Sequence, residues 1–438
     1  MFSTAVILAG GKGTRIQESF PGIAKPMVPV AEKPVLQHII ETYSAQGIER
    51  FFITIGYLGS QIQDFFGDGS RWNIDIQYVI EDQPLGTAGA LSLLQDKLSD
   101  PFWVIYGDTI SSIHLKKMSD FHLEKNAQLT LFVHPNDHPY DSDLISYDSI
   151  NKITKVHSKP HSPNLEFANC VNAAFYLMNP EIINEIPKNT SSDFGRDLFQ
   201  KWTDIFEMYA YNSTEYIKDM GKSERRKEVE KAYLNGKVDS RNIAKKQKAI
   251  FIDRDGVINH DTDLIKHQDE MSVYEFAGPA IRRINKSEYI SIVITNQSVI
   301  ARGLCNVNTL NLIHSRMDKQ LGEMGAYIDY LYYCPHHPDG GFPEEIKEFK
   351  IDCECRKPKP GMILEASKKF NIDLSKSWMI GDSPRDIQSG LSAGVKTVRV
   401  ETGHGNIESE IEPHFKVKNL AHAVDLILNN KIKTLQTK

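Results

Sequence analysis

Two aspartates one residue apart, Asp253 and Asp255, follow the apolar run "KAIFI" past the middle of the chain. At the end of a strand, the first carboxylate can attack a phosphorus atom, and the second can protonate the leaving oxygen and then activate water. In isolation the same pattern is more often a turn or a Ca²⁺ loop. The chain also opens on an apolar run followed by glycines, "AVILAGGKGTR". Either one fold uses both stretches, or two enzymes share one polypeptide.

Three later stretches supply what phosphate transfer to Asp253 would need. Thr295 and Asn296 in "ITNQS" would contact phosphate and substrate, and Lys357 in "CRKPKPG" would neutralise the phosphate charge. Asp386 in "IGDSPRD" is a weaker candidate, expected to cap a helix or to support the site from behind. Carboxylates are the ligands that Mg²⁺ prefers. The expected Mg²⁺ ligands are Asp253, Asp255 and Asp382.

A cysteine cluster lies shortly before Lys357. It reads Cys334-x-His336, then sixteen residues, then Cys353-x-Cys355. Three thiolates and one imidazole form a tetrahedral Zn²⁺ set with no open position, so the expected site is structural. Free buried cysteines are the alternative, and His337 could replace His336 as the fourth ligand.

These stretches resemble a known superfamily. "FIDRDGVIN" is similar to the first motif of the haloacid dehalogenase superfamily, and "CPHHP" followed by "CECRKPKPGM" resembles its heptose bisphosphate phosphatase branch, with histidinol phosphatases as close relatives. The resemblance implies a phosphatase without a large cap domain, in which zinc stiffens a loop over the active site. Arg356, next to the expected ligand Cys355, is our candidate for holding the phosphate that is not cleaved.

The glycines near the start of the chain leave backbone N–H groups free to approach phosphate oxygens, and Arg15 adds a bidentate cation. The loop is not a Walker A sequence, and Ile16 stands where a dinucleotide fingerprint has its third glycine. A tight turn between a strand and a helix is the alternative interpretation. The expected nucleotide contacts in this loop are Leu8, Gly10, Gly11 and Gly13.

A second stretch at a fixed spacing after the glycine loop extends this motif. "LAGGKGTR", nine residues and then "KPMVPV" resemble the signature of sugar-1-phosphate nucleotidylyltransferases. In that family the lysine, here Lys25, assists the departing pyrophosphate. The resemblance further implies that Asp108 in "YGD" and Asp219 in "IKDMG" hold a Mg²⁺ shared with the triphosphate. It also assigns base recognition to the loop "EDQPLGTAGAL", with the expected contacts Gln83, Gly86 and Thr87.

The sugar contacts depart from the pattern of this family. Lys159 in "HSKP" would hold the sugar phosphate, but Ser158 stands where the family usually has glutamate. Asn172 lies on the stretch "VNAAFYL" that resembles the sugar-binding strand, and "NAA" replaces the commoner Asn-Ala-Gly. The departures leave the reaction class intact and concern the sugar alone.

Length and composition fit two enzymes in one chain. The 438 residues exceed one ordinary core and predict two or three domains. A formal net charge of -6 gives no support to nucleic acid or an anionic membrane as a partner. An N-terminus without signal-peptide features and the absence of long apolar runs favour a cytoplasmic protein. Five cysteines argue against a disulfide framework, and we expect Cys170 and Cys305 to be plain core residues.

The elements that position these residues alternate along both halves. Apolar β-rich runs such as "RFFITIGY" and "FWVIYGD" in the first half, and "YISIVITNQ" and "SWMIGDS" in the second, alternate with helical patterns. We therefore expect two doubly wound α/β domains, each with a mainly parallel sheet covered by helices. The expected bounds are 1–235 for the nucleotidylyltransferase domain, 236–247 for a basic linker and 248–438 for the phosphatase domain.

The two resemblances make sense as consecutive steps. A heptose 1,7-bisphosphate phosphatase leaves heptose 1-phosphate, which a sugar-1-phosphate nucleotidylyltransferase consumes. The first half resembles the guanylyltransferase for D-glycero-α-D-manno-heptose 1-phosphate, which implies GDP-heptose synthesis from heptose phosphates and GTP for a bacterial surface polysaccharide. The alternative is a mannose or glucose 1-phosphate nucleotidylyltransferase joined to a histidinol-phosphate-type phosphatase. A homo-oligomer is compatible with the sequence, which does not fix the oligomeric state.

Overall fold

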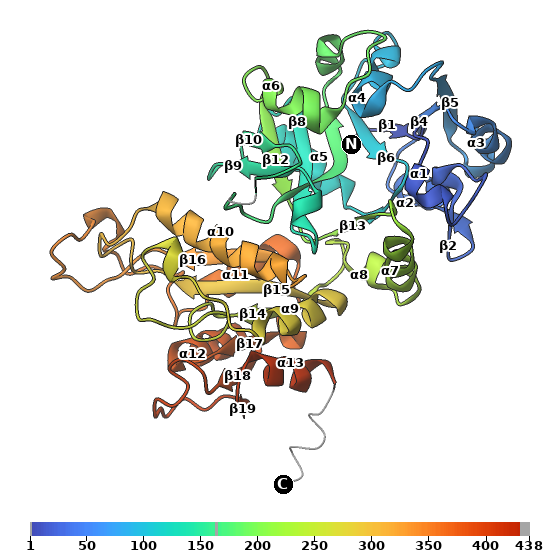
Figure 1. The fold of residues 1–438 in the computed structure, drawn as a ribbon. Helices are drawn as coiled ribbons and strands as arrows, with labels where there is room; N and C mark the ends of the chain where they lie inside the picture. The colour runs from blue at the N-terminus through green and yellow to red at the C-terminus, as the bar shows by residue number, and fades with distance from the viewer. Residues whose placement is uncertain (1, 163–164, 430–438) are drawn as a thin grey trace. The chain divides into compact units, whose positions relative to one another are not determined.

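The computed structural model describes residues 2–162 and 165–429 and divides the chain into two compact units (Figure 1). Unit 1 comprises Met1–His134, Tyr140–His161 and Cys170–Asn242, and unit 2 comprises Pro135–Pro139, Ser162–Asn169 and Ile243–Lys438. The main division falls inside 236–247, the expected linker, which also carries the short helix α8 (Lys237–Ser240). The exact bounds of the two domains stay a prediction.

Unit 1 is built on a nine-stranded sheet whose main path runs β10-β9-β11-β6-β1-β4-β5, with β8 pairing β11 and β12 pairing β8. Its strands are β1 (Thr4–Leu8), β4 (Arg50–Ile55), β5 (Asp75–Ile80), β6 (Phe102–Tyr106), β8 (Leu129–His134), β9 (Leu144–Tyr147), β10 (Ile153–His157), β11 (Val171–Met178) and β12 (Met208–Asn212).

This sheet is mixed rather than mainly parallel as expected. Strands β1, β4, β5 and β6 pair in parallel, but β11 runs antiparallel to β6, β8 and β9. Strands β9 and β10 also pair antiparallel, since their short connection can join only antiparallel neighbours. The parallel half therefore carries the glycine loop, and the antiparallel half carries the expected sugar-binding strand.

Helices cover both faces of the sheet, which is why its central strands β1, β4 and β6 are mostly apolar. Along β1, Ala5 and Ile7 belong to one core and Val6 to the other. The helices of unit 1 are α1 (Thr14–Gln17), α2 (Val35–Ser44), α3 (Gly59–Phe66), α4 (Gly86–Gly89), α5 (Leu115–Glu124), α6 (Phe199–Trp202), α7 (Ser223–Leu234) and α8. Two small antiparallel pairs complete the unit: β2 (Pro29–Val30) with β3 (Lys33–Pro34), and β7 (Thr109–Ser112) with β13 (Tyr216–Asp219).

Unit 2 has a six-stranded sheet in the order β16-β15-β14-β17-β18-β19, and every pairing in it is parallel. Its strands are β14 (Lys248–Ile252), β15 (Tyr289–Asn296), β16 (Tyr330–Cys334), β17 (Trp378–Gly381), β18 (Lys396–Val400) and β19 (Phe415–Val417). Its helices are α9 (Ala277–Lys286), α10 (Val307–Glu323), α11 (Gly361–Phe370), α12 (Pro384–Ala393) and α13 (Leu420–Leu428).

The strand order of unit 2 determines where its polar residues gather. The three central strands β15, β14 and β17 are parallel, so their carboxyl ends lie at one edge, where open α/β sheets bind ligands. Side chains of β14 point alternately into two cores, with Ile250 and Ile252 in one and Phe251 in the other. Among the helices in the described ranges, none is long and apolar enough to cross a membrane.

Candidate active sites

The glycine loop of unit 1 connects β1 to α1 and closes against two other segments. Gly13 has φ of 59°, a left-handed conformation that favours glycine, and a Cβ there would lie 2.9 Å from Lys25 Cβ. A Cβ on Gly10 would overlap Glu81 Oε1. The glycines therefore let this loop approach Lys25 on one side and Glu81 on the other.

Three of the charged residues expected in the transferase site lie close together, namely Lys25, Asp108 and Asp219. Lys25 Nζ forms an ion pair with Asp108 Oδ2, which joins the segment after the glycine loop to the turn after β6. Strand β13 pairs with β7 so that Asp219 lies opposite Thr109, and Met220 N donates to Asp108 O over 3.0 Å. The backbones of Asp108 and Asp219 are thus side by side.

Arg15 approaches the same place from α1. A Cβ on Gly221 would lie 2.8 Å from Asp219 Oδ1 and 3.7 Å from Arg15 Nη2, so the two side chains flank Gly221. Arg225 Nη1 donates to Asp219 Oδ2 over 2.7 Å. Two carboxylates bordered by Arg15 and Lys25 suit a Mg²⁺–triphosphate complex, because the aspartates would supply oxygen ligands and the cations would offset the phosphate charge.

The expected base-recognition loop is held mainly by contacts within unit 1. Thr87 Oγ1 donates to Asp193 Oδ2 over 2.8 Å, and a Cβ on Gly86 would overlap the backbone of Ser192. Gln83 is exposed. The structure thus gives Gly86 and Thr87 packing roles that the sequence did not indicate, and it adds Glu81, whose pKa is raised by burial, beside the glycine loop.

The expected sugar contacts lie on the antiparallel side of the sheet. Lys159 Nζ donates to Asp141 O over 3.0 Å, and Ser158 Oγ donates to Gly195 O. Asn172 Oδ1 accepts from Ala174 N over 3.2 Å, at the bulge where the register of β11 shifts. Ala174 itself has φ of 58°, in the region that favours glycine.

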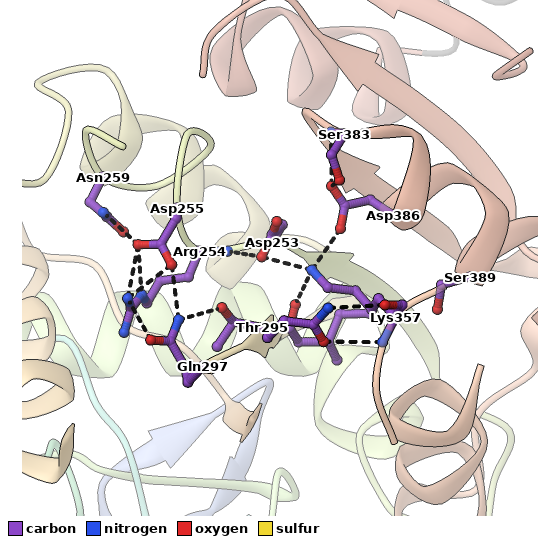
Figure 2. Close-up of polar contacts among 12 residues, drawn as sticks. Asp253, Arg254, Asp255, Asn259, Thr295, Gln297, Lys357, Ser383, Asp386 and Ser389 are labelled. Atoms are coloured by element: carbon purple, nitrogen blue, oxygen red, sulfur yellow. Dashed lines mark hydrogen bonds and ion pairs between the residues drawn. The ribbon is translucent and has the colours of Figure 1, made fainter. Parts of the chain in front are cut away.

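In unit 2, the expected phosphatase residues lie where the central strands end (Figure 2). Asp253 follows β14, Thr295 is near the end of β15, and Asp382 follows β17. Lys357 reaches them from the segment before α11. Its side chain is 2% exposed, and its Nζ lies 2.8 Å from Asp253 Oδ1 and 2.6 Å from Asp386 Oδ1.

Lys357 is fixed by both its side chain and its main chain. Its Nζ also donates to Ile294 O over 2.9 Å. Burial would lower the pKa of Lys357, but the carboxylates of Asp253 and Asp386 raise it overall. Asn296, which we expected to bind substrate, instead holds the Lys357 main chain through two hydrogen bonds of 3.0 Å, from its Nδ2 to Lys357 O and from Lys357 N to its Oδ1.

Three carboxylates form the candidate metal group, and their identity differs in part from our expectation. Oxygens of Asp253, Asp382 and Asp386 lie within 4.8 Å of one another. Asp386 caps α12 as expected, accepting from Ser383 N over 2.9 Å, but its other oxygen enters this group. Burial and the charge of Asp386 raise the pKa of Asp253, and raise that of Asp382 to about 7. A divalent cation would relieve this repulsion, so the residues fit Mg²⁺.

Asp255, expected in the metal group, is held elsewhere in Figure 2. Arg254 Nη2 donates to both of its oxygens over 2.9 Å, and Asn259 and Gln297 donate over 3.0 and 2.9 Å. Burial opposes ionisation of Asp255, but these donors hold its pKa below the usual range. Gln297 also donates to Thr295 Oγ1 over 2.8 Å. Asp255, which we expected among the Mg²⁺ ligands, therefore lies outside the group of Asp253, Asp382 and Asp386.

Sequence reasoning passed over the donors that hold Asp255. Arg254 is 0% exposed, and a buried guanidinium requires a carboxylate partner. The position of Arg254 between two aspartates was the available signal. Gln297 follows directly on the two residues that were selected from "ITNQS".

The cysteine cluster has the dimensions of a four-coordinate zinc site. Cys353 Sγ lies 3.5 Å from Cys334 Sγ and 3.3 Å from Cys355 Sγ, and His336 Nδ1 lies 3.7 and 3.4 Å from Cys334 and Cys355 Sγ. A tetrahedral Zn²⁺ with Zn–S of ~2.3 Å separates its ligand atoms by roughly 3.5–3.8 Å. Hydrogen bonding to Cys334 and burial raise the pKa of Cys355, and a bound metal would favour its thiolate form.

The neighbouring residues separate the two histidines. His336 belongs to the four-residue group, whereas His337 Nε2 lies 3.4 Å from Arg302 Nη2 and its Nδ1 accepts from Asp339 N. Arg356 Nη1 donates to His336 O over 2.9 Å, which ties it to the cluster. Outside the cluster, Cys170 is buried and Cys305 is partly buried against a core.

Two family models match the chain. Residues 4–236 match the nucleotidyl transferase family, and residues 354–423 match a HAD-hydrolase-like family. The first match covers the glycine loop, Lys25, Asp108 and Asp219, and the second covers Lys357 and Asp382.

Curated relatives extend the second match. The chain is 40% identical over 156 residues to D-glycero-β-D-manno-heptose-1,7-bisphosphate 7-phosphatase of Yersinia pestis, covering 35% of this chain and 81% of that protein. The corresponding phosphatase of Escherichia coli K12 is 40% identical over 162 residues, covering 37% and 83%.

Solved structures also resemble each half. The D,D-heptose 1,7-bisphosphate phosphatase of Bordetella bronchiseptica with magnesium and phosphate is 35% identical with a TM-score of 0.38, covering 42% of this chain and 99% of its own. HddC from Yersinia pseudotuberculosis is 26% identical with a TM-score of 0.47, covering 53% and 100%. From its family match and its curated relatives, the chain belongs to the nucleotidyl transferase family and also to the heptose-bisphosphate phosphatases, and it joins two enzymes in one polypeptide.

Proposed function

We propose that the chain makes GDP-D-glycero-α-D-manno-heptose in two steps. Its phosphatase removes the 7-phosphate of the heptose 1,7-bisphosphate, and its nucleotidylyltransferase joins the resulting heptose 1-phosphate to GTP and releases pyrophosphate. The observation that supports this most is the combination itself. The curated relatives are named for a heptose bisphosphate. The other half matches the nucleotidyl transferase family and resembles sugar-1-phosphate nucleotidylyltransferases, which would use the anomeric phosphate that such a phosphatase leaves in place.

In the phosphatase step, an oxygen of Asp253 attacks the phosphorus, and the bond from phosphorus to the sugar oxygen breaks; water then hydrolyses the aspartyl phosphate, which releases inorganic phosphate and restores Asp253. Lys357, already 2.8 Å from Asp253, offsets the negative charge of the transferred group. Mg²⁺ held by Asp253, Asp382 and Asp386 would polarise the phosphoryl oxygens. Asp255 can protonate the leaving oxygen only after it turns away from Arg254 and Gln297 and gains a proton.

In the transferase step, the sugar phosphate attacks the α-phosphorus of the triphosphate, and pyrophosphate leaves. Asp108 and Asp219 would hold Mg²⁺, and a metal bound there would offset the negative charge of the triphosphate and of its leaving group. Lys25 then exchanges its carboxylate partner Asp108 for the departing pyrophosphate, and Arg15, which lies near Gly221 and Asp219, adds a second positive charge. The protein contributes position and positive charge rather than covalent chemistry.

We further propose that Cys334, His336, Cys353 and Cys355 bind a structural Zn²⁺ and that Arg356, bonded to His336 O, holds the phosphate that is not cleaved. The proposed ligands of the whole chain are then small phosphorylated sugars and GTP. Because these ligands are supplied in the cytoplasm, we propose that the protein acts there.

The proposal also specifies the anomer of the heptose phosphate and the base of the nucleotide. The relatives are named for the β-anomer, whereas the transferase half resembles an enzyme for the α-anomer. Purified full-length chain should be given each anomer of the bisphosphate in turn, with each of the four triphosphates and Mg²⁺. We expect nucleotide-sugar only from the α-anomer and mainly with GTP. A product formed from the β-anomer with ATP would refute this assignment.

The rival function is tested in the same assay. A mannose or glucose 1-phosphate transferase joined to a histidinol-type phosphatase should prefer those substrates. Faster turnover of mannose 1-phosphate than of heptose 1-phosphate, or of histidinol phosphate than of the bisphosphate, would favour the rival.

A further inference from the structure

Asp143 lies between two residues that were expected to bind the sugar. Its Oδ1 accepts from Lys159 N over 3.2 Å, and its main-chain oxygen accepts from Asn172 N over 2.9 Å. It directly precedes β9, the strand that pairs both β10 and β11. No motif in the sequence singled out this residue.

The neighbouring Ser158 stands where the family usually has glutamate, so this chain lacks the carboxylate of the common motif. Ser158 uses its hydroxyl within the protein, donating to Gly195 O. Gly195 also lies close to the Asp143 carboxylate, since a Cβ on Gly195 would overlap Asp143 Oδ2. A carboxylate from the segment before β9 is therefore present next to the residue that follows Ser158.

One oxygen of this carboxylate is available to a ligand. Within the described residues, the only hydrogen bond to the side-chain carboxylate of Asp143 is the one from Lys159 N to Oδ1, and Oδ2 receives none. Burial raises the pKa of Asp143, and the nearby Lys159 opposes that shift. A partly buried carboxylate oxygen without a donor is costly unless a ligand or water supplies one.

We propose that Asp143 Oδ2 accepts a hydrogen bond from a hydroxyl group of the sugar 1-phosphate and replaces the glutamate that Ser158 lacks. This inference rests on the proposed transferase and names a specificity-determining residue of its sugar site. Sugar hydroxyls are neutral donors, and a carboxylate binds them more strongly than a neutral acceptor does. The absence of a side chain at Gly195 leaves space for this carboxylate, because a side chain there would displace it.

The decisive variant is Asp143→Asn. Its amide oxygen can still accept from Lys159 N, so the tether of that segment is kept, but its NH₂ group cannot accept from a hydroxyl. We expect KM for the preferred sugar 1-phosphate to rise about 10- to 100-fold, as for the loss of one charged hydrogen bond. KM for GTP and the phosphatase rate should stay within about twofold. An unchanged sugar KM would overturn the proposal.

Asp148→Asn is the matched control. Asp148 follows β9 and accepts from Ile150 N and Lys152 N in an exposed turn, where an asparagine oxygen can replace it. This variant should leave every constant unchanged. Ser158→Glu in the Asp143→Asn background should recover part of the lost sugar affinity, because it returns a carboxylate to the family position.

A second measurement separates contact from support. Wild type and Asp143→Asn should be compared on monodeoxy analogues of the preferred sugar 1-phosphate. Loss of the contacted hydroxyl should weaken binding to the wild type but not to Asp143→Asn. If no analogue shows this difference, Asp143 contacts no hydroxyl and the proposal is wrong. Because the sugar is chosen by turnover, a preference for mannose 1-phosphate would refute heptose as the substrate without affecting this test.

Discussion

Lys357 Nζ lies 2.8 Å from Asp253 Oδ1, although the lysine comes from a segment far from β14 in the sequence. The pair is buried, and Asp386 shares the same ammonium group at 2.6 Å. One cation thus faces two carboxylates at the end of the sheet. Binding of a metal ion or of a phosphate would therefore change the net charge of this buried group.

The first prediction follows from this pair. Lys357→Met keeps the length of the side chain but removes the charge that faces Asp253 and the phosphate, so the phosphatase kcat should fall about 10²- to 10³-fold. Lys359→Met is the control, because Lys359 pairs with exposed Asp352 and Glu354 on the same segment. Phosphate release measures both, and a normal kcat in Lys357→Met would remove Lys357 from the mechanism.

The second prediction concerns the independence of the two catalysts. Asp108→Asn should abolish pyrophosphate release and spare phosphate release, and Asp253→Asn should do the reverse, since each unit carries its own acids and cations. Both reactions should be followed on the same preparations. If either substitution silenced both activities, the two-enzyme account would be wrong.

The third prediction concerns the zinc cluster. Cys355→Ser removes one of four ligands, and the binding energy of a structural metal is also folding energy, so the variant should lose Zn²⁺ and melt at a lower temperature in the phosphatase unit. Cys305→Ser, outside the cluster, is the matched control and should keep its metal. Elemental analysis of protein prepared without chelator gives the result. A wild type without zinc would contradict the assignment.

The fourth prediction uses backbone strain. Ala174 has φ of 58°, where a Cβ costs about 1 kcal/mol, so Ala174→Gly should stabilise unit 1 by about that amount. The neighbouring Ala173→Gly, at a buried position of β11, should destabilise it. Thermal unfolding measures the stability of both variants. The transition of unit 1 is identified as the one whose midpoint temperature shifts when GTP is added. Equal losses in the two variants would show that Ala174 is unstrained.

Much of the fold followed from local pattern. Apolar runs bounded by glycine and polar residues located β1, β4, β6, β14, β15 and β17, because strands covered on both faces are apolar throughout. The antiparallel direction of β11 was not visible, since its run is as apolar as that of a parallel strand and only its partners fix its direction.

The grouping of residues within short motifs was predicted from the sequence. The contacts between segments that are far apart in the sequence were not predicted. The spacing of Cys334, His336, Cys353 and Cys355 anticipated their grouping. The partners of Asp255 depend on the buried position of Arg254, and the role of Asp386 depends on where α12 begins beside Lys357. Asp143 lies opposite the motif residues only because β9 pairs with β10 and β11.

The central claim is that one chain carries out both steps. Full-length protein should be supplied with D-glycero-α-D-manno-heptose 1,7-bisphosphate, GTP and Mg²⁺, and the products followed over time by mass spectrometry. We predict that inorganic phosphate and heptose 1-phosphate form first and that GDP-heptose and pyrophosphate follow, because the transferase has no assigned cation for a second phosphate. If nucleotide-sugar that still carries the 7-phosphate accumulated, or if phosphate were released without any GDP-heptose, the account would be contradicted.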